Sequence, residues 1–248
     1  MNLDFEKNKH LFGTWERVIS PIFHLLNPIY EELQGLSKRG KKIFPHYEQT
    51  FRCFQETDYN NLRAVVVDLC PYHSMTKEKI IVADGIPLSC SNTNKEQPSL
   101  TKWYDALERE FSKETIIRDT NLSYLGKQGI LMYNFALTVE SMKASSHNKL
   151  WEPFTKSFIE EIISITGVPV ILLGKEVHKV EKWLAPFQWC FKLDHPASAA
   201  YSETDWETNG TFEKVRRIVW DNNKEELKWW KETNSLTMEL EVSADFYF

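Results

Sequence analysis

The chain has 248 residues, of which 42% are hydrophobic and 26% charged, a balance typical of a globular protein built as one domain. The net charge of −5 excludes a surface that is basic all over, although a local cluster of lysine and arginine can still bind a nucleic acid. The apolar runs are far shorter than the roughly 18 residues of a membrane span. Residues 1–6 lack the basic and apolar regions of a secretory signal, so we expect a cytoplasmic protein.

The predicted elements begin with a mostly helical part. Residues 11–36 are expected to be helical, and short apolar runs then alternate with amphipathic segments. Continuous apolar runs, typical of strands buried on both faces of a parallel sheet, occur at residues 64–69, 129–134, 168–174 and 189–193. Apolar residues at helical spacing lie between them, at residues 99–111, 151–165 and 178–184.

This alternation predicts an α/β fold with a central four-stranded parallel sheet flanked by helices. We expect residues 1–248 to form a single domain, with an N-terminal helical part at 1–60 and a C-terminal extension at 220–248. In such sheets, functional side chains gather at the carboxyl ends of the strands. Polar clusters follow three of the predicted strands, at residues 70–73, at Asn134 and at residues 194–196.

Four segments carry these clusters and their surroundings. Residues 65–73 read VVVDLCPYH, residues 129–139 read GILMYNFALTV, residues 146–155 read SHNKLWEPFT, and residues 194–200 read DHPASAA. In this order and spacing, they resemble motifs of the family 1 uracil-DNA glycosylases. The first is similar to the water-activating motif Gly-Gln-Asp-Pro-Tyr-His, and the second is similar to the strand that reads uracil. The resemblance runs over residues 15–230.

The resemblance implies a DNA glycosylase, which rotates a nucleotide out of DNA into a pocket. Asn134 is then expected to read the base edge, and Tyr72 to wall the pocket near the pyrimidine 5-position, with His73 beside them. His195 is expected to stabilise the negative charge that builds on the departing base. Contacts with DNA are expected from five residues: Pro196, Ser198, Ala199, Lys175 and Ser89.

The chain departs from the family pattern inside the site. Cys70 stands where the family has its water-activating aspartate, and Asp68 lies two residues earlier, on the same side of an extended strand. The catalytic set expected from this pattern is His195, Asp68 and Cys70. Leu88 replaces the aromatic side chain that stacks on uracil, and the stretch between residues 73 and 85 is longer than in the family. Ala199 takes the place of a leucine that wedges into DNA.

A smaller stacking side chain and a longer loop make room beside the base. We therefore expect Cys70, Tyr72, Leu88, Asn134 and His195 to line one cavity that accepts a modified pyrimidine. The predicted reaction is hydrolysis of the N-glycosidic bond, which leaves an abasic site. One setting would be defence against phages whose DNA carries hypermodified bases.

Two alternatives stay open. Tyr72, Asn134 and His195 favour ordinary uracil excision in base excision repair, while the cysteine at position 70 opposes it. A catalytically inactive DNA-binding subunit would explain the lost carboxylate, but such a subunit has no physical reason to keep the pocket residues.

Each site residue also has a plain structural interpretation. His195 can be an ordinary strand-end histidine, Asn134 a turn-forming amide, and Cys70 an inert buried thiol. The four cysteines lack Cys-x-x-Cys spacing and the histidines lack ligand spacing, so we expect free thiols, no metal and no cofactor. We expect a monomer that binds DNA and no membrane.

Overall fold

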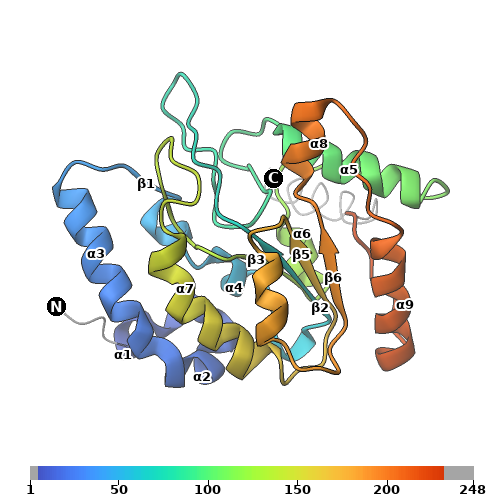
Figure 1. Ribbon diagram of the computed structural model, residues 1–248, viewed down its shortest axis with the longest axis horizontal. Helices are drawn as coiled ribbons and strands as arrows, with labels where there is room; N and C mark the ends of the chain where they lie inside the picture. Colours follow the sequence, from blue (N-terminus) through green and yellow to red (C-terminus); the bar gives the residue numbers. More distant parts are fainter. Residues whose placement is uncertain (1–4, 232–248) are drawn as a thin grey trace, which may run out of the picture.

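The structure is a computed structural model that describes residues 5–231 (Figure 1). Its main sheet has the order β3-β2-β5-β6, and every neighbouring pair is parallel. The strands are β2 (Ala64–Asp68), β3 (Ile130–Asn134), β5 (Val170–Leu173) and β6 (Cys190–Leu193). All four apolar runs therefore form the predicted strands, and the α/β fold class is confirmed.

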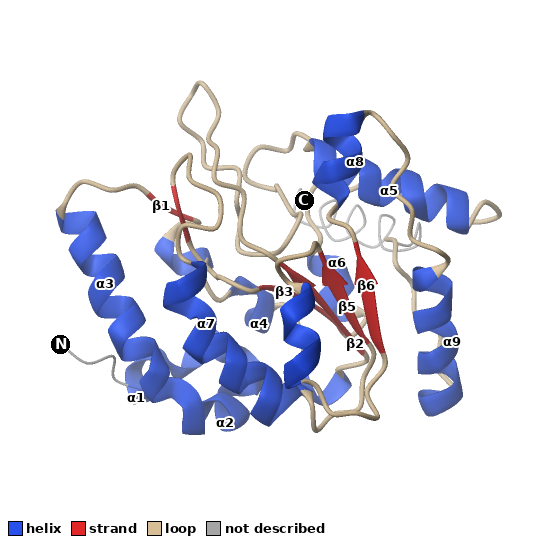
Figure 2. Cartoon of the chain, viewed as in Figure 1, coloured by secondary structure: helices blue, strands red, loops and turns tan. Residues whose placement is uncertain are grey.

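Helices lie on both faces of the main sheet (Figure 2). Successive side chains of the strands pack with one helical layer or the other. Val65 and Val67 pack with the N-terminal helices, whereas Ala64 and Val66 pack on the opposite side. The first layer also holds α7 (Asn148–Ser157), the π-helical turn η5 (Phe158–Ile163) and the 3-10 turn η6 (His178–Trp183). The second layer holds α5 (Pro98–Glu110), α6 (Ser123–Lys127), α8 (Pro196–Ser202) and α9 (Thr211–Asn223).

The N-terminal part is helical, as predicted, but it is broken into short pieces. They are α1 (Phe5–Asn8), η1 (Lys9–Trp15), α2 (Glu16–Ile19), η2 (Ser20–Leu25) and α3 (Leu26–Lys38). Gly13 has a φ of 51° and a ψ of −130°, which lies outside the helical region, and Pro21 lacks a backbone donor within η2. Further short helices follow at η3 (Tyr47–Gln49), α4 (Arg52–Gln55) and η4 (Tyr59–Asn61).

A small antiparallel ribbon, which periodicity alone does not predict, closes one side of the sheet's carboxyl edge. Its strands are β1 (Ile43–Phe44) and β4 (Val139–Glu140). Phe44 and Val139 pack with Ala83 in a small buried cluster, and Cys70 and Tyr72 lie against it. The ribbon thus supports the segment that follows β2.

The described part of the predicted C-terminal extension packs on the second layer. Trp229 and Trp230 are buried there, as expected for core residues. Residues 232–248 lie outside the described part of the chain, and the single-domain assignment of residues 1–248 stays a prediction. Within residues 5–231, none of the helices combines the length and apolar character that a membrane crossing requires.

Candidate active site

Two polar side chains meet where the central strands end. Asp68 and Asn134 are the last residues of β2 and β3 and stand opposite each other in the strand register. Both are buried, at 3% and 2% exposure. The Oδ1 atom of Asn134 has no hydrogen-bond partner among the described residues. A buried acceptor without a partner is costly to the fold, so this oxygen is well suited to a ligand that brings a donor.

His195 reaches the same point from β6. Its Nε2 lies 2.9 Å from Oδ1 of Asp68, and its Nδ1 accepts a hydrogen bond from the backbone N–H of Ala197 at 3.0 Å. Because Nδ1 accepts, the ring proton sits on Nε2 and is donated to Asp68. The ring therefore caps the start of α8 and holds a donor beside the ends of β2 and β3.

Gly174 makes room for the histidine. Its φ is +93°, and a Cβ added there would stand 3.2 Å from the Cβ of His195. A side chain at position 174 would be strained by its backbone and would press on His195. The glycine after β5 thus belongs to the construction of the site.

The protonation of His195 is set by opposing effects. Burial lowers the pKa of the ring, but the charge of Asp68 and the hydrogen bond to it outweigh burial, so the pKa lies above its usual value. Protonation of Nδ1 would end the bond from Ala197, which favours the neutral ring. In both forms, Nε2 carries a proton that it can donate.

Cys70 lies beside this pair but holds no charge at neutral pH. Burial raises the pKa of its thiol to about 11, and the nearby charge of Asp68 acts in the same direction. Hydrogen bonds with Ser145 oppose the shift without cancelling it. The thiol is therefore neither a thiolate nucleophile nor a substitute for a carboxylate, so the place of Cys70 in the catalytic set is not supported by its chemistry.

The segment after β2 also contacts the loop that carries Leu88. The hydroxyl of Tyr72 donates to the backbone oxygen of Leu88 at 3.2 Å. Burial raises the pKa of this phenol well above its usual value, so it stays a neutral donor. The Nδ1 atom of His73 is buried and lacks a partner in the described part of the chain. Tyr72 and Leu88 are thus joined by a hydrogen bond, and the base-binding roles of Tyr72, Leu88 and His73 stay predictions.

The described residues form a cavity away from the expected base site, and the cavity predicted to be shared by Cys70, Tyr72, Leu88, Asn134 and His195 stays a prediction. A cavity of about 620 Å³ lies between α3, β1 and the loop near Met75, and it touches none of Asp68, Asn134 and His195. Leu88 is only 3% exposed and packs in the second layer, so its short side chain is accommodated by the core.

The five predicted DNA contacts divide into two groups. Ser198 and Lys175 are exposed, so both can meet a phosphate or base. Ser89 is fully buried and its hydroxyl donates to Asp84 at 2.6 Å. Ala199 is 7% exposed, and Pro196 is also buried at the start of α8. Their side chains face the protein interior, so the predicted DNA contacts of Ser89, Ala199 and Pro196 are corrected.

The sequence analysis did not predict a buried ion pair that lies close to the loop carrying Leu88. Asp84 is fully buried, and its Oδ2 lies 3.0 Å from Nη1 of Arg52 on α4. The only local signal is the pair Asp84-Gly85, which is typical of a tight turn.

All four cysteines are free thiols, as predicted. Among the described side chains, no three histidine, cysteine or carboxylate groups are arranged to hold a metal ion.

The fold and the site define an α/β protein whose acid, histidine and amide meet at the carboxyl edge of a parallel sheet. No family model matches the chain. The uracil-DNA glycosylase of Aliivibrio salmonicida is 30% identical over 210 residues, which is 82% of this chain and 91% of that protein. The Francisella tularensis uracil-DNA glycosylase is 36% identical over 158 residues, covering 60% of this chain and 67% of that protein.

The solved structure of mimivirus uracil-DNA glycosylase is similar with a TM-score of 0.76 and 18% identity, and covers 93% of this chain and 90% of that one. This likeness supports the fold, and the sequence relatives support the family. The chain belongs to the uracil-DNA glycosylase family.

Proposed function

We propose that this chain is a DNA glycosylase that binds a pyrimidine nucleotide rotated out of DNA and hydrolyses its N-glycosidic bond. The observation that carries the proposal is the meeting of Asp68, His195 and Asn134 at one sheet edge, with His195 donating to Asp68 at 2.9 Å. The product would be DNA with an abasic site.

Asn134 is proposed to read the base. Its free, buried Oδ1 accepts a hydrogen bond from a base that presents a donor on its Watson–Crick edge. Uracil offers its ring N–H there, and cytosine offers its exocyclic amine. The amide therefore suits a pyrimidine, and the substituents of the base have to be read by other groups.

The chemistry is proposed to begin with an exchange of partners at His195. When the base enters, the Nε2–H turns from Asp68 to an oxygen of the base and stabilises the charge that develops there. The N–C1′ bond breaks with its electron pair going to the base, and the water oxygen bonds to C1′. Asp68, now free, takes the proton that this water loses. The carboxylate thus does the work that the family motif assigns to the position of Cys70.

The base preference is the finer part of the proposal. We propose a modified pyrimidine, because the stretch between residues 73 and 85 is longer than in the family, and we place the activity in defence against phages with hypermodified DNA. The buried side chain of Leu88 does not contribute to this argument. One observation favours uracil instead: the hydroxyl of Tyr72 is held by the Leu88 backbone at 3.2 Å, which keeps a rigid ring where a bulky 5-substituent would lie.

The experiment compares oligonucleotides that carry uracil, 5-methylcytosine or 5-hydroxymethylcytosine at one position. Abasic sites are counted by alkali cleavage under single-turnover conditions, and mass spectrometry identifies bases released from phage DNAs of different modification. We expect release of at least one pyrimidine, with loss of that release in His195→Ala. If the wild type binds DNA and releases nothing, the inactive DNA-binding subunit becomes the better description.

A further inference from the structure

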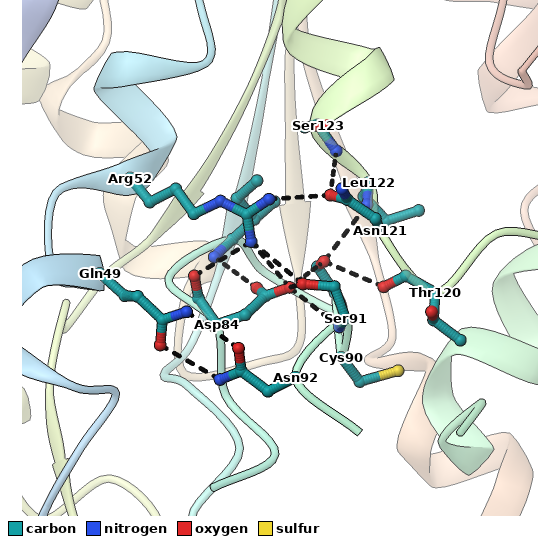
Figure 3. A network of polar contacts seen from close by, with 12 residues as sticks. Gln49, Arg52, Asp84, Cys90, Ser91, Asn92, Thr120, Asn121, Leu122 and Ser123 are labelled. Carbon is teal, nitrogen blue, oxygen red and sulfur yellow. Dashed lines mark hydrogen bonds and ion pairs between the residues drawn. The ribbon is translucent and has the colours of Figure 1, made fainter. Parts of the chain in front are cut away.

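A second polar assembly lies behind the Leu88 loop, away from the reacting groups. At its centre is the buried carboxylate of Asp84 (Figure 3). It accepts hydrogen bonds from the hydroxyls of Ser89 and Ser91 at 2.6 and 2.5 Å, and from the backbone N–H groups of Ile86 and Ser91 at 3.2 and 3.0 Å. One carboxylate therefore ties down most of residues 84–91.

Arg52 anchors this carboxylate to two other parts of the chain. Its Nη1 lies 3.0 Å from Asp84, and its Nη2 donates to Oδ1 of Asn121 at 2.9 Å. Its Nε donates to Glu56 at 3.3 Å, within the same helical region. Figure 3 shows the guanidinium reaching between Asp84 and Asn121. A charged pair this deeply buried is expensive unless every member is hydrogen-bonded, as these are.

The loop that the network holds has an unusual backbone. Leu88 has a φ of 61°, a conformation that costs energy for any side chain other than glycine. Gly85 has a φ of +94°, and a Cβ there would stand 1.9 Å from the backbone oxygen of Gln49. The loop is thus packed against the end of η3 at Gln49 on one side and bonded to Asp84 on the other.

Leu88, whose backbone is strained, is also the residue that bonds to Tyr72 of the candidate active site. The backbone oxygen of Leu88 accepts the hydrogen bond of the Tyr72 hydroxyl at 3.2 Å. A continuous series of bonds therefore leads from Arg52 through Asp84 and its loop to Tyr72.

We propose that Asp84 and Arg52 are positioning residues for base selection: they hold the Leu88 carbonyl so that it fixes the ring of Tyr72. This inference rests on the proposed function, in which Tyr72 walls the base pocket. With the network intact, the ring of Tyr72 is held rigidly. It then discriminates between pyrimidines whose substituents differ in size on the edge of the base that faces Tyr72. Without the network, the loop relaxes and the Tyr72 hydroxyl keeps only its hydrogen bond with Ser99 of α5, so the ring is held less firmly and bulkier pyrimidines are rejected less well.

The test is a double-mutant cycle between Asp84→Asn and Tyr72→Phe. The readout is the ratio of kcat/KM for uracil to that for 5-hydroxymethyluracil in the same oligonucleotide. Loss of one hydrogen bond changes such a ratio by about fivefold, and we expect Tyr72→Phe to lower it by this factor. Asp84→Asn is expected to lower it similarly, and the double variant to match Tyr72→Phe alone.

Glu110→Gln is the matched control. Glu110 is a part-buried carboxylate that accepts from the Thr208 hydroxyl at 2.8 Å, at the end of α5. Its variant should leave the ratio unchanged. Ser91→Ala removes one donor to Asp84 and keeps the ion pair, so it serves if Asp84→Asn does not fold. An additive cycle, or an unchanged ratio in a folded network variant, overturns the proposal.

NMR of the free protein separates this inference from the proposed function. We expect Asp84→Asn to speed amide exchange in residues 85–91, where Ile86 and Ser91 donate to Asp84, and to shift the ring signals of Tyr72, with Glu110→Gln as the control. If the wild type releases no base yet both changes appear, the proposed function fails and the positioning role stands. If the ring signals of Tyr72 stay unchanged, the positioning role is refuted whatever the activity.

Discussion

Asp68→Asn is the substitution that separates the reaction from the fold most cleanly. In the structure, one oxygen of Asp68 accepts both the backbone N–H of Leu69 at 2.7 Å and the Nε2–H of His195 at 2.9 Å. An asparagine oxygen has two lone pairs and nearly the same position, so both hydrogen bonds can survive. The variant removes the negative charge and leaves the shape.

The two expected magnitudes differ widely. A hydrogen bond to a charged group contributes about 1 kcal/mol more than one to a neutral group, so the free energy of unfolding should fall by about that amount. A carboxylate that accepts a proton in the transition state is typically worth about 10²–10⁴ in rate, or about 3–5 kcal/mol. We therefore expect a large loss of base release in a protein that is almost as stable as the wild type.

Single-turnover base release and urea unfolding measure the two quantities on the same preparations. Asp194→Asn is the control, because Asp194 is an exposed carboxylate next to His195 and its backbone oxygen, not its side chain, accepts from Trp206. If Asp68→Asn keeps its rate within about threefold of the wild type, a carboxylate effect of the expected size is absent and Asp68 is not the base.

The remaining predictions concern the residues around this pair. Cys70→Ala should change base release by less than about threefold, measured by alkali cleavage, because a thiol with a pKa of about 11 is neutral. Asn134→Leu should abolish release yet leave the urea midpoint unchanged or higher, because it removes a buried oxygen without a partner. In an NMR titration, the pKa of His195 should lie above 6.5 in the wild type and fall in Asp68→Asn, where burial acts alone. The raised pKa stabilises the fold fully below pH 6.5, so the stability difference between these two proteins should shrink as pH rises through the folded-state pKa of His195. Gly174→Ala should lower the free energy of unfolding by about 1–2 kcal/mol and slow base release, since φ there is +93° and the new methyl group would press on His195.

The main sheet was predictable because its strands carry their signal locally. A run such as residues 64–68 is buried on both faces, so it reads as continuous branched aliphatic residues between polar ends. The ribbon of β1 and β4 has only two residues per strand, too few for any periodicity to be visible. The helical N-terminal part was predicted, but its breaks depend on backbone angles at positions such as Gly13 that composition does not specify.

The candidate site was predictable where a residue is carried by a strand end. Asp68, Asn134 and His195 each follow or end a core strand, and parallel strands bring their carboxyl ends to one edge. The Arg52–Asp84 pair could not be found in this way, because a helix and a loop 32 residues apart form it. The burial of Ala199 was also hidden, since a helix of seven residues does not reveal which side faces the core.

The position of the carboxylate decides which partner it keeps. A residue two places earlier on a strand points the same way but lies about 6.7 Å further back. The side chain of Asp68 is 3% exposed and contacts His195, which follows β6. A carboxylate at position 70 would lie further along the chain, beyond the end of β2, and away from this contact. In the resting site, Asp68 therefore occupies the Nε2–H of His195, the donor that the proposed mechanism gives to the departing base. The enzyme would have to break that bond in every turnover. Its chemical step should therefore be slower than that of an enzyme whose histidine has no such partner.

The double substitution Asp68→Gly with Cys70→Asp would restore the family motif at both positions and release His195. It should excise uracil faster than either single variant under single-turnover conditions. An equal or lower rate would mean that the bond between Asp68 and His195 does not hold the reaction back.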